Sequence, residues 1–276
     1  MRAELVCDGK HELAEGPVWH KGALWWVNIN AGELHRLGEK RQVRPSLGCA
    51  APCADGRWLC GAGGELGFYD WQSARWETIA VVEQETRNRF NDGKCDPAGR
   101  FWVGSMSRKQ EAATGGLYVM DGALRPKRVL TERMISNGLA WSPDGSRMYH
   151  TDSWTRRVEV FDCDGDRISA GRKWAEFEAF PDGMASDAAG NVWVALWGGS
   201  SVVCLDGTTG RTLEKVELPV SQVSSCAFGG EDLATLYITT AHEHLQPEQR
   251  AREPLAGGIF AARPGVKGLA VAQFKF

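Results

Sequence analysis

Short runs of aromatic and β-branched residues recur along the chain, and each follows a turn rich in glycine, aspartate or asparagine. The turns supply the positive φ angles that tight hairpins need, and the runs suit a half-buried pleated surface. The turn glycines repeat at intervals of roughly 34 to 46 residues, the period of a four-stranded propeller blade. The runs are Ala23–Val27, Arg57–Cys60, Arg100–Val103, Ser146–Thr151, Asn191–Ala195 and Thr235–Thr239.

A second strand can be recognised after several of these runs. Examples are Arg157–Asp162, where the alternation of polar and apolar residues is clearest, Gly116–Met120 and Gly258–Ala261. A long helical period is absent from the pattern, and Pro247 interrupts the helix-forming residues of His242–Glu253. We therefore predict an all-β six-bladed β-propeller with four-stranded blades, formed as a single domain over residues 1–276, and a long loop with one helical turn at His242–Glu253.

The composition fits this fold. Among 276 residues, 33 glycines match the many turns and 12 tryptophans can fill the space between blades. The formal net charge of −3 comes without a basic stripe, which argues against nucleic acid or a membrane as partner. The charged first residues resemble no secretory signal, so a cytoplasmic protein with eight reduced cysteines is expected. A disulfide among Cys49, Cys53 and Cys60 is the less favoured alternative.

Isolated acid and amide residues precede strands in four of the predicted blades. They are Glu15 before Gly16-Pro17, Asn91 before Asp92-Gly93, Asn137 before Gly138 and Asp182 before Gly183. Taken singly, Glu15 reads as a solvated acid and the other three as turn residues. Equivalent positions of different blades, however, lie on one rim of a propeller and converge on its axis.

Taken together, these side chains predict a metal site at the mouth of the central channel. Carboxylate and amide oxygens are hard ligands that suit Ca²⁺, Mg²⁺ or Mn²⁺, with Zn²⁺ or Fe²⁺ as alternatives. Three protein ligands leave positions open for water and substrate, as in a catalytic site. Asp152 has two interpretations, a rim residue or a strand-end cap, and His150 and His20 fit backbone-bonded structural histidines better than a general base.

Several segments resemble the regucalcin (senescence marker protein) and gluconolactonase family of six-bladed propellers, in the bacterial sugar-lactone lactonase branch. The resemblance spans almost the whole chain and is carried by EGPVW, RFNDGKCDPAGRFWVGSM, SNGLAWSPDGSRMYHTDS, PDGMASDAAGNVWVALWGG and AGGIF. It implies one divalent metal bound by Glu15, Asn137 and Asp182, with Asp182 also transferring protons. It further implies that Arg89 and Asn91 bind the substrate.

The expected activity is hydrolysis of a sugar-acid lactone, with gluconolactone as the first candidate and pentonolactones or galactonolactone as alternatives. The metal would polarise the lactone carbonyl while Asp182 moves the proton of the attacking water. Phosphotriester cleavage is a conceivable side activity, and a calcium-binding regulatory propeller without turnover is the alternative function. The predicted partner is a small-molecule lactone, and the predicted state is a monomer or weak homo-oligomer. Ser107–Glu111 departs from the glutamates of animal regucalcins, which leaves a substrate contact from that loop open.

Overall fold

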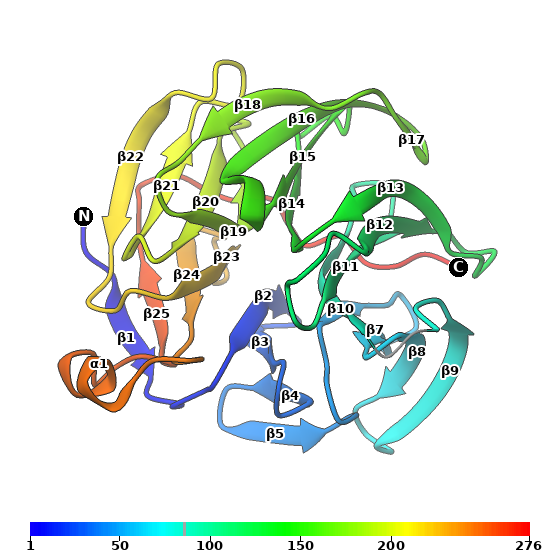
Figure 1. The fold of residues 1–276 in the computed structure, drawn as a ribbon, viewed down its shortest axis with the longest axis horizontal. Helices are drawn as coiled ribbons and strands as arrows, with labels where there is room; N and C mark the ends of the chain where they lie inside the picture. The colour runs from blue at the N-terminus through cyan, green and yellow to red at the C-terminus, as the bar shows by residue number, and fades with distance from the viewer. Residues whose placement is uncertain (85–86) are drawn as a thin grey trace.

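The computed structural model of the protein describes residues 1–84 and 87–276, and within them six antiparallel sheets are arranged in a ring (Figure 1). The predicted six-bladed propeller with four-stranded blades is confirmed. Each blade consists of consecutive hairpins, so that neighbouring strands in a sheet are mostly neighbours in sequence.

The first three blades run in chain order around the ring. Their strands are β2 (Ala14–His20), β3 (Ala23–Asn28), β4 (Glu33–Arg36) and β5 (Glu39–Gln42); β6 (Cys49–Pro52), β7 (Trp58–Ala62), β8 (Glu65–Asp70) and β9 (Arg75–Val81); and β10 (Asn88–Cys95), β11 (Phe101–Ser107), β12 (Gly115–Met120) and β13 (Lys127–Arg133). The aromatic runs of the sequence form the second strand of each blade.

The last three blades complete the ring. Their strands are β14 (Ser136–Trp141), β15 (Arg147–Asp152), β16 (Arg157–Asp164), β17 (Arg167–Ile168) and β18 (Arg172–Glu176); β19 (Phe180–Ser186), β20 (Val192–Trp197), β21 (Ser201–Leu205) and β22 (Thr212–Glu217); and β23 (Val223–Gly229), β24 (Thr235–Thr240), β25 (Ile259–Ala262) and β1 (Glu4–Cys7). A 3₁₀ turn, η1 (Ser153–Thr155), follows β15, and α1 (Pro247–Arg252) lies in the loop predicted to hold one helical turn.

The core is divided into clusters between adjacent blades, as expected for sheets that pack face to face around an axis. Tryptophans fill these seams. Trp25 and Trp58 come from neighbouring blades and their ring centroids lie 4.6 Å apart. Large rings suit this position because each one covers much apolar surface with few rotatable bonds.

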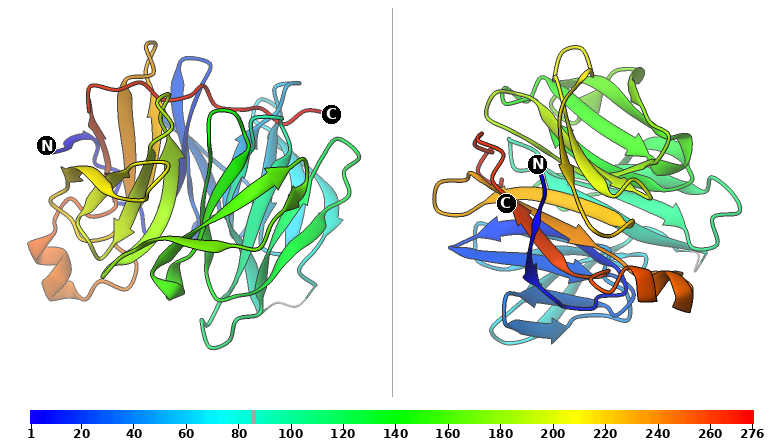
Figure 2. Two further views of the ribbon diagram at one scale, coloured as in Figure 1. Left: turned by 90° about the horizontal axis from the view of Figure 1, so that it is seen from above. Right: turned by 90° about the vertical axis from the view of Figure 1, so that its left-hand side faces the viewer.

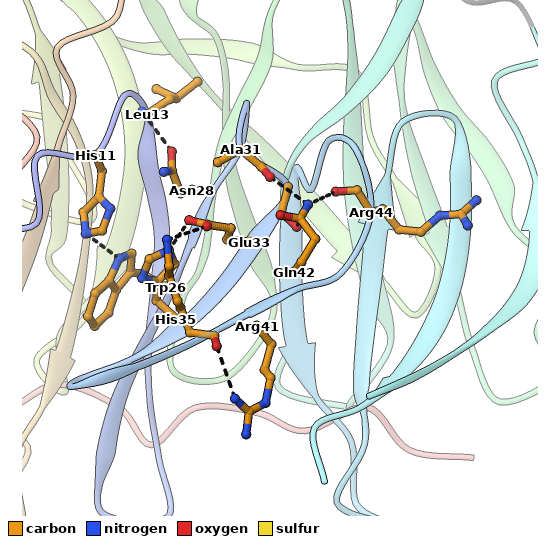
Figure 3. Close-up of polar contacts among 12 residues, drawn as sticks. His11, Leu13, Trp26, Asn28, Ala31, Glu33, His35, Arg41, Gln42 and Arg44 are labelled. Atoms are coloured by element: carbon orange, nitrogen blue, oxygen red, sulfur yellow. Dashed lines mark hydrogen bonds and ion pairs between the residues drawn. The ribbon is translucent and has the colours of Figure 1, made fainter. Parts of the chain in front are cut away.

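The ring closes where the two ends of the chain meet in one blade. The N-terminal strand β1 pairs antiparallel with β25, so the last blade combines residues from both termini. Next to this junction, His11 packs edge-on to His35 at 4.6 Å and accepts a hydrogen bond from Trp26 Nε1 at 3.2 Å (Figure 3). A buried polar and aromatic cluster therefore connects the segment after β1 to the first complete blade.

The innermost strands lie nearest the ring axis and are irregular at equivalent places. The pairing register shifts between Glu15 and Val18, between Phe90 and Gly93, between Ser136 and Leu139, and between Pro181 and Met184. An irregularity of this kind, a β-bulge, changes the direction in which a side chain points.

The segment after β25 crosses one face of the ring, on the side away from the loops that carry α1 (Figure 2). It forms single bridges to two separate blades, Gly268 with Asp187 and Phe274 with Cys53. No described helix has the length and apolar character needed to cross a bilayer.

Candidate active site

A cavity of about 190 Å³ opens at one end of the central channel. All five residues predicted for metal or substrate binding line this cavity: Glu15, Arg89, Asn91, Asn137 and Asp182. They come from the innermost strands β2, β10, β14 and β19. Residues from four blades, spread over more than half of the sequence, therefore face one space.

The local structure differs from the interpretation of single motifs as turns. Asn91, Asn137 and Asp182 lie inside strands, within the register shifts described above. Glu15 likewise lies in β2, and its Oε2 accepts a hydrogen bond from the Gly16 amide at 2.9 Å. The solvated and turn interpretations are wrong, because these side chains are directed to the channel and are 5 % exposed.

The electrostatics of the cluster are unfavourable without a cation. Burial raises the pKa of Glu15 well above its usual range, and the nearby carboxyls of Asp182 and Asp92 raise it further. Burial also raises the pKa of Asp182, again with a contribution from Asp92. Three acidic groups that oppose each other's ionisation are a setting in which a bound cation would be stabilised.

Three buried oxygens in this cluster lack a hydrogen-bond partner in the described part of the chain: Asn137 Oδ1, Asp182 Oδ1 and Asp92 Oδ2, of which the first two belong to residues that line the cavity. Unpaired buried oxygens are rare and costly, so these atoms need a cation or a hydrogen-bond donor as a partner. Among the described residues no three His, Cys, Asp or Glu side chains are grouped to hold a metal. A metal here would thus need the amide oxygen of Asn137 beside Glu15 and Asp182, and the donor set fits a hard divalent cation.

Arg89 and Asn91 form a connected pair on the wall of the cavity. Arg89 donates to Asn91 Oδ1 at 2.6 Å and to the Phe90 carbonyl at 3.0 Å, while Asn91 Nδ2 donates to the Ser136 carbonyl at 3.0 Å. Burial lowers the pKa of Arg89 to about 10, so the guanidinium remains charged at neutral pH. Asn91 holds Arg89 in place, and Arg89 retains N–H groups for an oxygen-rich ligand.

Further residues of the channel were not identified as functional from the sequence. Asp92 is buried, with its Oδ2 unpaired among the described residues. Lys94 Nζ donates to the Leu139 carbonyl at 3.2 Å and lowers the pKa of Asp92, which burial raises. Lys94 also lines a second cavity of about 350 Å³ at the opposite end of the channel, beneath the C-terminal segment.

The mouth of the first cavity carries aromatic and acidic side chains that sequence motifs also missed. Trp154 is 54 % exposed and stacks on Phe180 with centroids 6.5 Å apart, and Trp197 and Glu243 line the same cavity. The Gly138 and Gly183 motifs drew attention to the channel, whereas Trp154, Trp197 and Glu243 belong to no repeated motif. Gln110 of the divergent loop does line the cavity.

The remaining candidates have structural roles. Asp152 accepts hydrogen bonds from the backbone amides of Met134, Ile135 and Trp154, so it is a cap. His150 is buried and bonded to the Asn137 carbonyl at 3.0 Å, and burial lowers its pKa to about 3. The eight cysteines are free thiols.

Comparison with known proteins agrees with the fold and the motifs. The sequence profile of the SMP-30/Gluconolactonase/LRE-like region matches residues 13–242. The chain is 35 % identical to regucalcin of Danio rerio over 98 % of its length and 97 % of that protein. It therefore belongs to the SMP-30/gluconolactonase/LRE-like family.

Two solved structures are closely similar along the whole chain. One is a luciferin-regenerating enzyme, with a TM-score of 0.92, 31 % identity and 99 % coverage of both chains. The other is regucalcin of Agrobacterium tumefaciens strain C58, described as a calcium-binding protein, with a TM-score of 0.94, 27 % identity and coverage of 99 % of this chain and 97 % of that one. The family thus includes both enzymes and proteins named for calcium binding.

Proposed function

We propose that this protein is a divalent-metal-dependent lactonase that hydrolyses a sugar-acid lactone to the open-chain acid. The observation that carries the proposal is the pair of unpaired buried oxygens, Asn137 Oδ1 and Asp182 Oδ1, beside the Glu15 carboxyl in one cavity. Membership of a family whose description includes gluconolactonase supports the reaction class. Gluconolactone is the first substrate candidate, with pentonolactones and galactonolactone as alternatives.

Glu15, Asn137 and Asp182 would hold the cation through oxygen atoms. When bound, a divalent cation supplies positive charge that polarises a lactone carbonyl and makes water easier to deprotonate. Its identity is open among Ca²⁺, Mg²⁺, Mn²⁺, Zn²⁺ and Fe²⁺, and the all-oxygen donor set favours the harder ions. The calcium-binding description of the Agrobacterium relative supports Ca²⁺ as the first ion to test.

The side chains of the cavity have complementary tasks in this reaction. Arg89, held by Asn91, binds oxygens of the lactone and orients its carbonyl carbon toward water. Asp182 accepts a proton from that water as the new C–O bond forms, and returns a proton to the ring oxygen as the ring C–O bond breaks. The net reaction consumes one lactone and one water and gives one hydroxy acid.

Chelation and restoration test the proposal. The protein is stripped of metal and assayed with xylono-, glucono- and galactonolactone, before and after each divalent ion is added back. We expect turnover to fall at least a hundredfold without metal and to recover with metal. Asp182→Ala should remain at the uncatalysed rate, while Asp144→Ala, in an exposed turn, should behave as the wild type.

A calcium-binding protein without turnover is the second candidate, favoured by the names of its regucalcin relatives. It would use the same three oxygens. Calorimetry that shows bound Ca²⁺, together with no hydrolysis of any lactone, would select this function. Turnover that survives chelation would instead show that the reaction does not require a metal.

A further inference from the structure

A carboxylate outside the predicted metal cluster is held at the mouth of the cavity. Glu243 lies in the loop between β24 and α1, and its side chain is 18 % exposed. Asn30 Nδ2 donates to Glu243 Oε1 at 2.7 Å, and Gln222 Nε2 donates to the Glu243 carbonyl at 2.8 Å. The first and last blades thus fix both its side chain and its backbone, which limits the rotamers it can adopt.

Glu243 is only partly satisfied by the protein. No hydrogen bond from the described residues reaches Oε2, although a carboxylate oxygen can accept more than one. Oε2 is not one of the fully buried unpaired atoms, so it remains accessible to water or to a ligand. Since the residue lines the cavity, a ligand bound there could donate to Oε2.

An opposite charge lines the same cavity. Arg89 and Glu243 interact electrostatically, and Glu243 raises the pKa that burial of Arg89 lowers. Nevertheless, no ion pair joins these two side chains in the described structure, and Arg89 instead donates to Phe90 and Asn91. The cavity therefore presents an acceptor and a donor that interact without contact.

A hydroxyl group is the chemical group that satisfies both, because it can donate one hydrogen bond and accept others. We propose that Glu243 and Arg89 together bind a hydroxyl of the lactone, and that Glu243 selects polyhydroxylated lactones over unsubstituted ones. This assignment rests on the proposed lactonase function and names its substrate class more closely. Gln110, which also lines the cavity, carries both donor and acceptor atoms and suits a neighbouring hydroxyl.

A matched pair of substitutions tests this proposal. Glu243→Gln keeps the shape of the side chain and exchanges one acceptor for a donor. Glu12→Gln is the control, because Glu12 Oε1 accepts from the same Asn30 amide at 3.1 Å but Glu12 is exposed and does not line the cavity. Each metal-loaded variant is assayed on glucono-δ-lactone and on δ-valerolactone, which has the same ring without hydroxyls.

We expect Glu243→Gln to lower the ratio of kcat/KM for gluconolactone to that for δ-valerolactone by about tenfold to a hundredfold, the range for a lost hydrogen bond to a charged group. The change should lie mainly in KM. Glu12→Gln should leave the ratio within about twofold of the wild type. An unchanged ratio in Glu243→Gln, or equal losses on both lactones, would overturn the assignment.

Failure of the proposed function gives a different result, namely a wild type that hydrolyses neither lactone. The hydroxyl site is then tested by calorimetry on the Ca²⁺-loaded protein with gluconate and with 5-hydroxyvalerate, the two hydrolysis products. Weaker binding of gluconate alone in Glu243→Gln would support the site. Equal binding of gluconate to the wild type and the variant would refute it.

Discussion

At the scale of single residues, Ser153 determines which way the Asn137 amide faces. The Ser153 hydroxyl donates its proton to the Pro181 carbonyl at 2.7 Å, so its oxygen must accept from Asn137 Nδ2 at 3.1 Å. The amide nitrogen is therefore occupied, and Oδ1 is the atom left unpaired in the cavity. Ser153 lies in η1 and serves to position the proposed metal ligand.

Removal of this hydroxyl should weaken metal binding. In Ser153→Ala, Asn137 loses the contact that orients it, and we expect the Ca²⁺ affinity to fall by about tenfold to a hundredfold, as for other residues that orient metal ligands. Isothermal titration calorimetry measures the change. Thr155→Val removes a hydroxyl from the same turn, where it bonds to the Asp152 carbonyl, and should leave the affinity unaltered. Similar affinities in Ser153→Ala and the wild type would refute the positioning role.

At the scale of elements, the glycines that follow the acid and amide residues made these positions recognisable in the sequence. The same glycines made strand residues look like turn residues. Asn137-Gly138 and Asp182-Gly183 correctly marked equivalent places in different blades, yet each looked like a turn. In the structure a Cβ on Gly138 would lie 2.2 Å from the Asp182 carbonyl oxygen, and one on Gly183 would lie 2.0 Å from Ser225 Oγ. Glycine is required here because innermost strands approach closely around the channel.

The hairpin period could be predicted because each blade repeats its own local pattern. The convergence of the five candidate residues followed from blade equivalence and family resemblance. Glu243 and Trp154 could not be predicted, because each lies between the second and third strands of its blade, a connection whose length and sequence differ from blade to blade. Their position depends on how the blades are arranged around the axis, which local patterns do not encode.

The junction between β1 and the first blade contains a second element-scale feature, the buried His11 ring (Figure 3). Burial lowers the pKa of His11 to about 4, and the nearby His35, Lys40 and His242 lower it further. The Glu33 carboxylate acts in the opposite direction and raises this pKa. Trp26 Nε1 donates to His11 Nε2, which requires that nitrogen to be unprotonated. The folded state therefore favours neutral His11.

Acid should consequently weaken the fold through this histidine. The unfolded chain takes up the proton below about pH 6.5, whereas the folded state resists it until about pH 4, so stability is lost as pH falls through that window. We expect the wild type to lose roughly 2 kcal/mol more unfolding free energy than His11→Asn does when the pH falls from 7 to 4.5. Urea denaturation at both pH values measures it. A pH-independent difference for His11→Asn would contradict the argument.

At the scale of the whole molecule, the two ends of the central channel have separate roles. Glu15, Asp182 and Arg89 line the cavity at one end. The C-terminal segment covers the other end (Figure 2). The N-terminal strand closes the ring within the last blade, and the C-terminal segment reaches across the ring to the second blade. Both termini therefore hold blades together at a distance from the proposed chemistry.

Phe274 anchors the C-terminal segment and provides the test of this separation. Its ring is fully buried, with its centroid 6.2 Å from that of Phe68. Its backbone amide donates to the Pro52 carbonyl at 2.8 Å, and its carbonyl accepts from the Ala54 amide at 3.1 Å. Phe274→Ala should cost about 3 to 5 kcal/mol, or roughly 10 °C in Tm by thermal denaturation. Phe276→Ala is the control. Its ring centroid lies 5.3 Å from that of Phe68, but the residue is 56 % exposed, so its loss should cost below about 1 kcal/mol.

Because the proposed metal ligands lie at the other end of the channel, Ca²⁺ affinity below the Tm should stay within about twofold in both variants. Equal Tm shifts, or a loss of Ca²⁺ binding in Phe274→Ala, would show that the two ends of the channel are coupled.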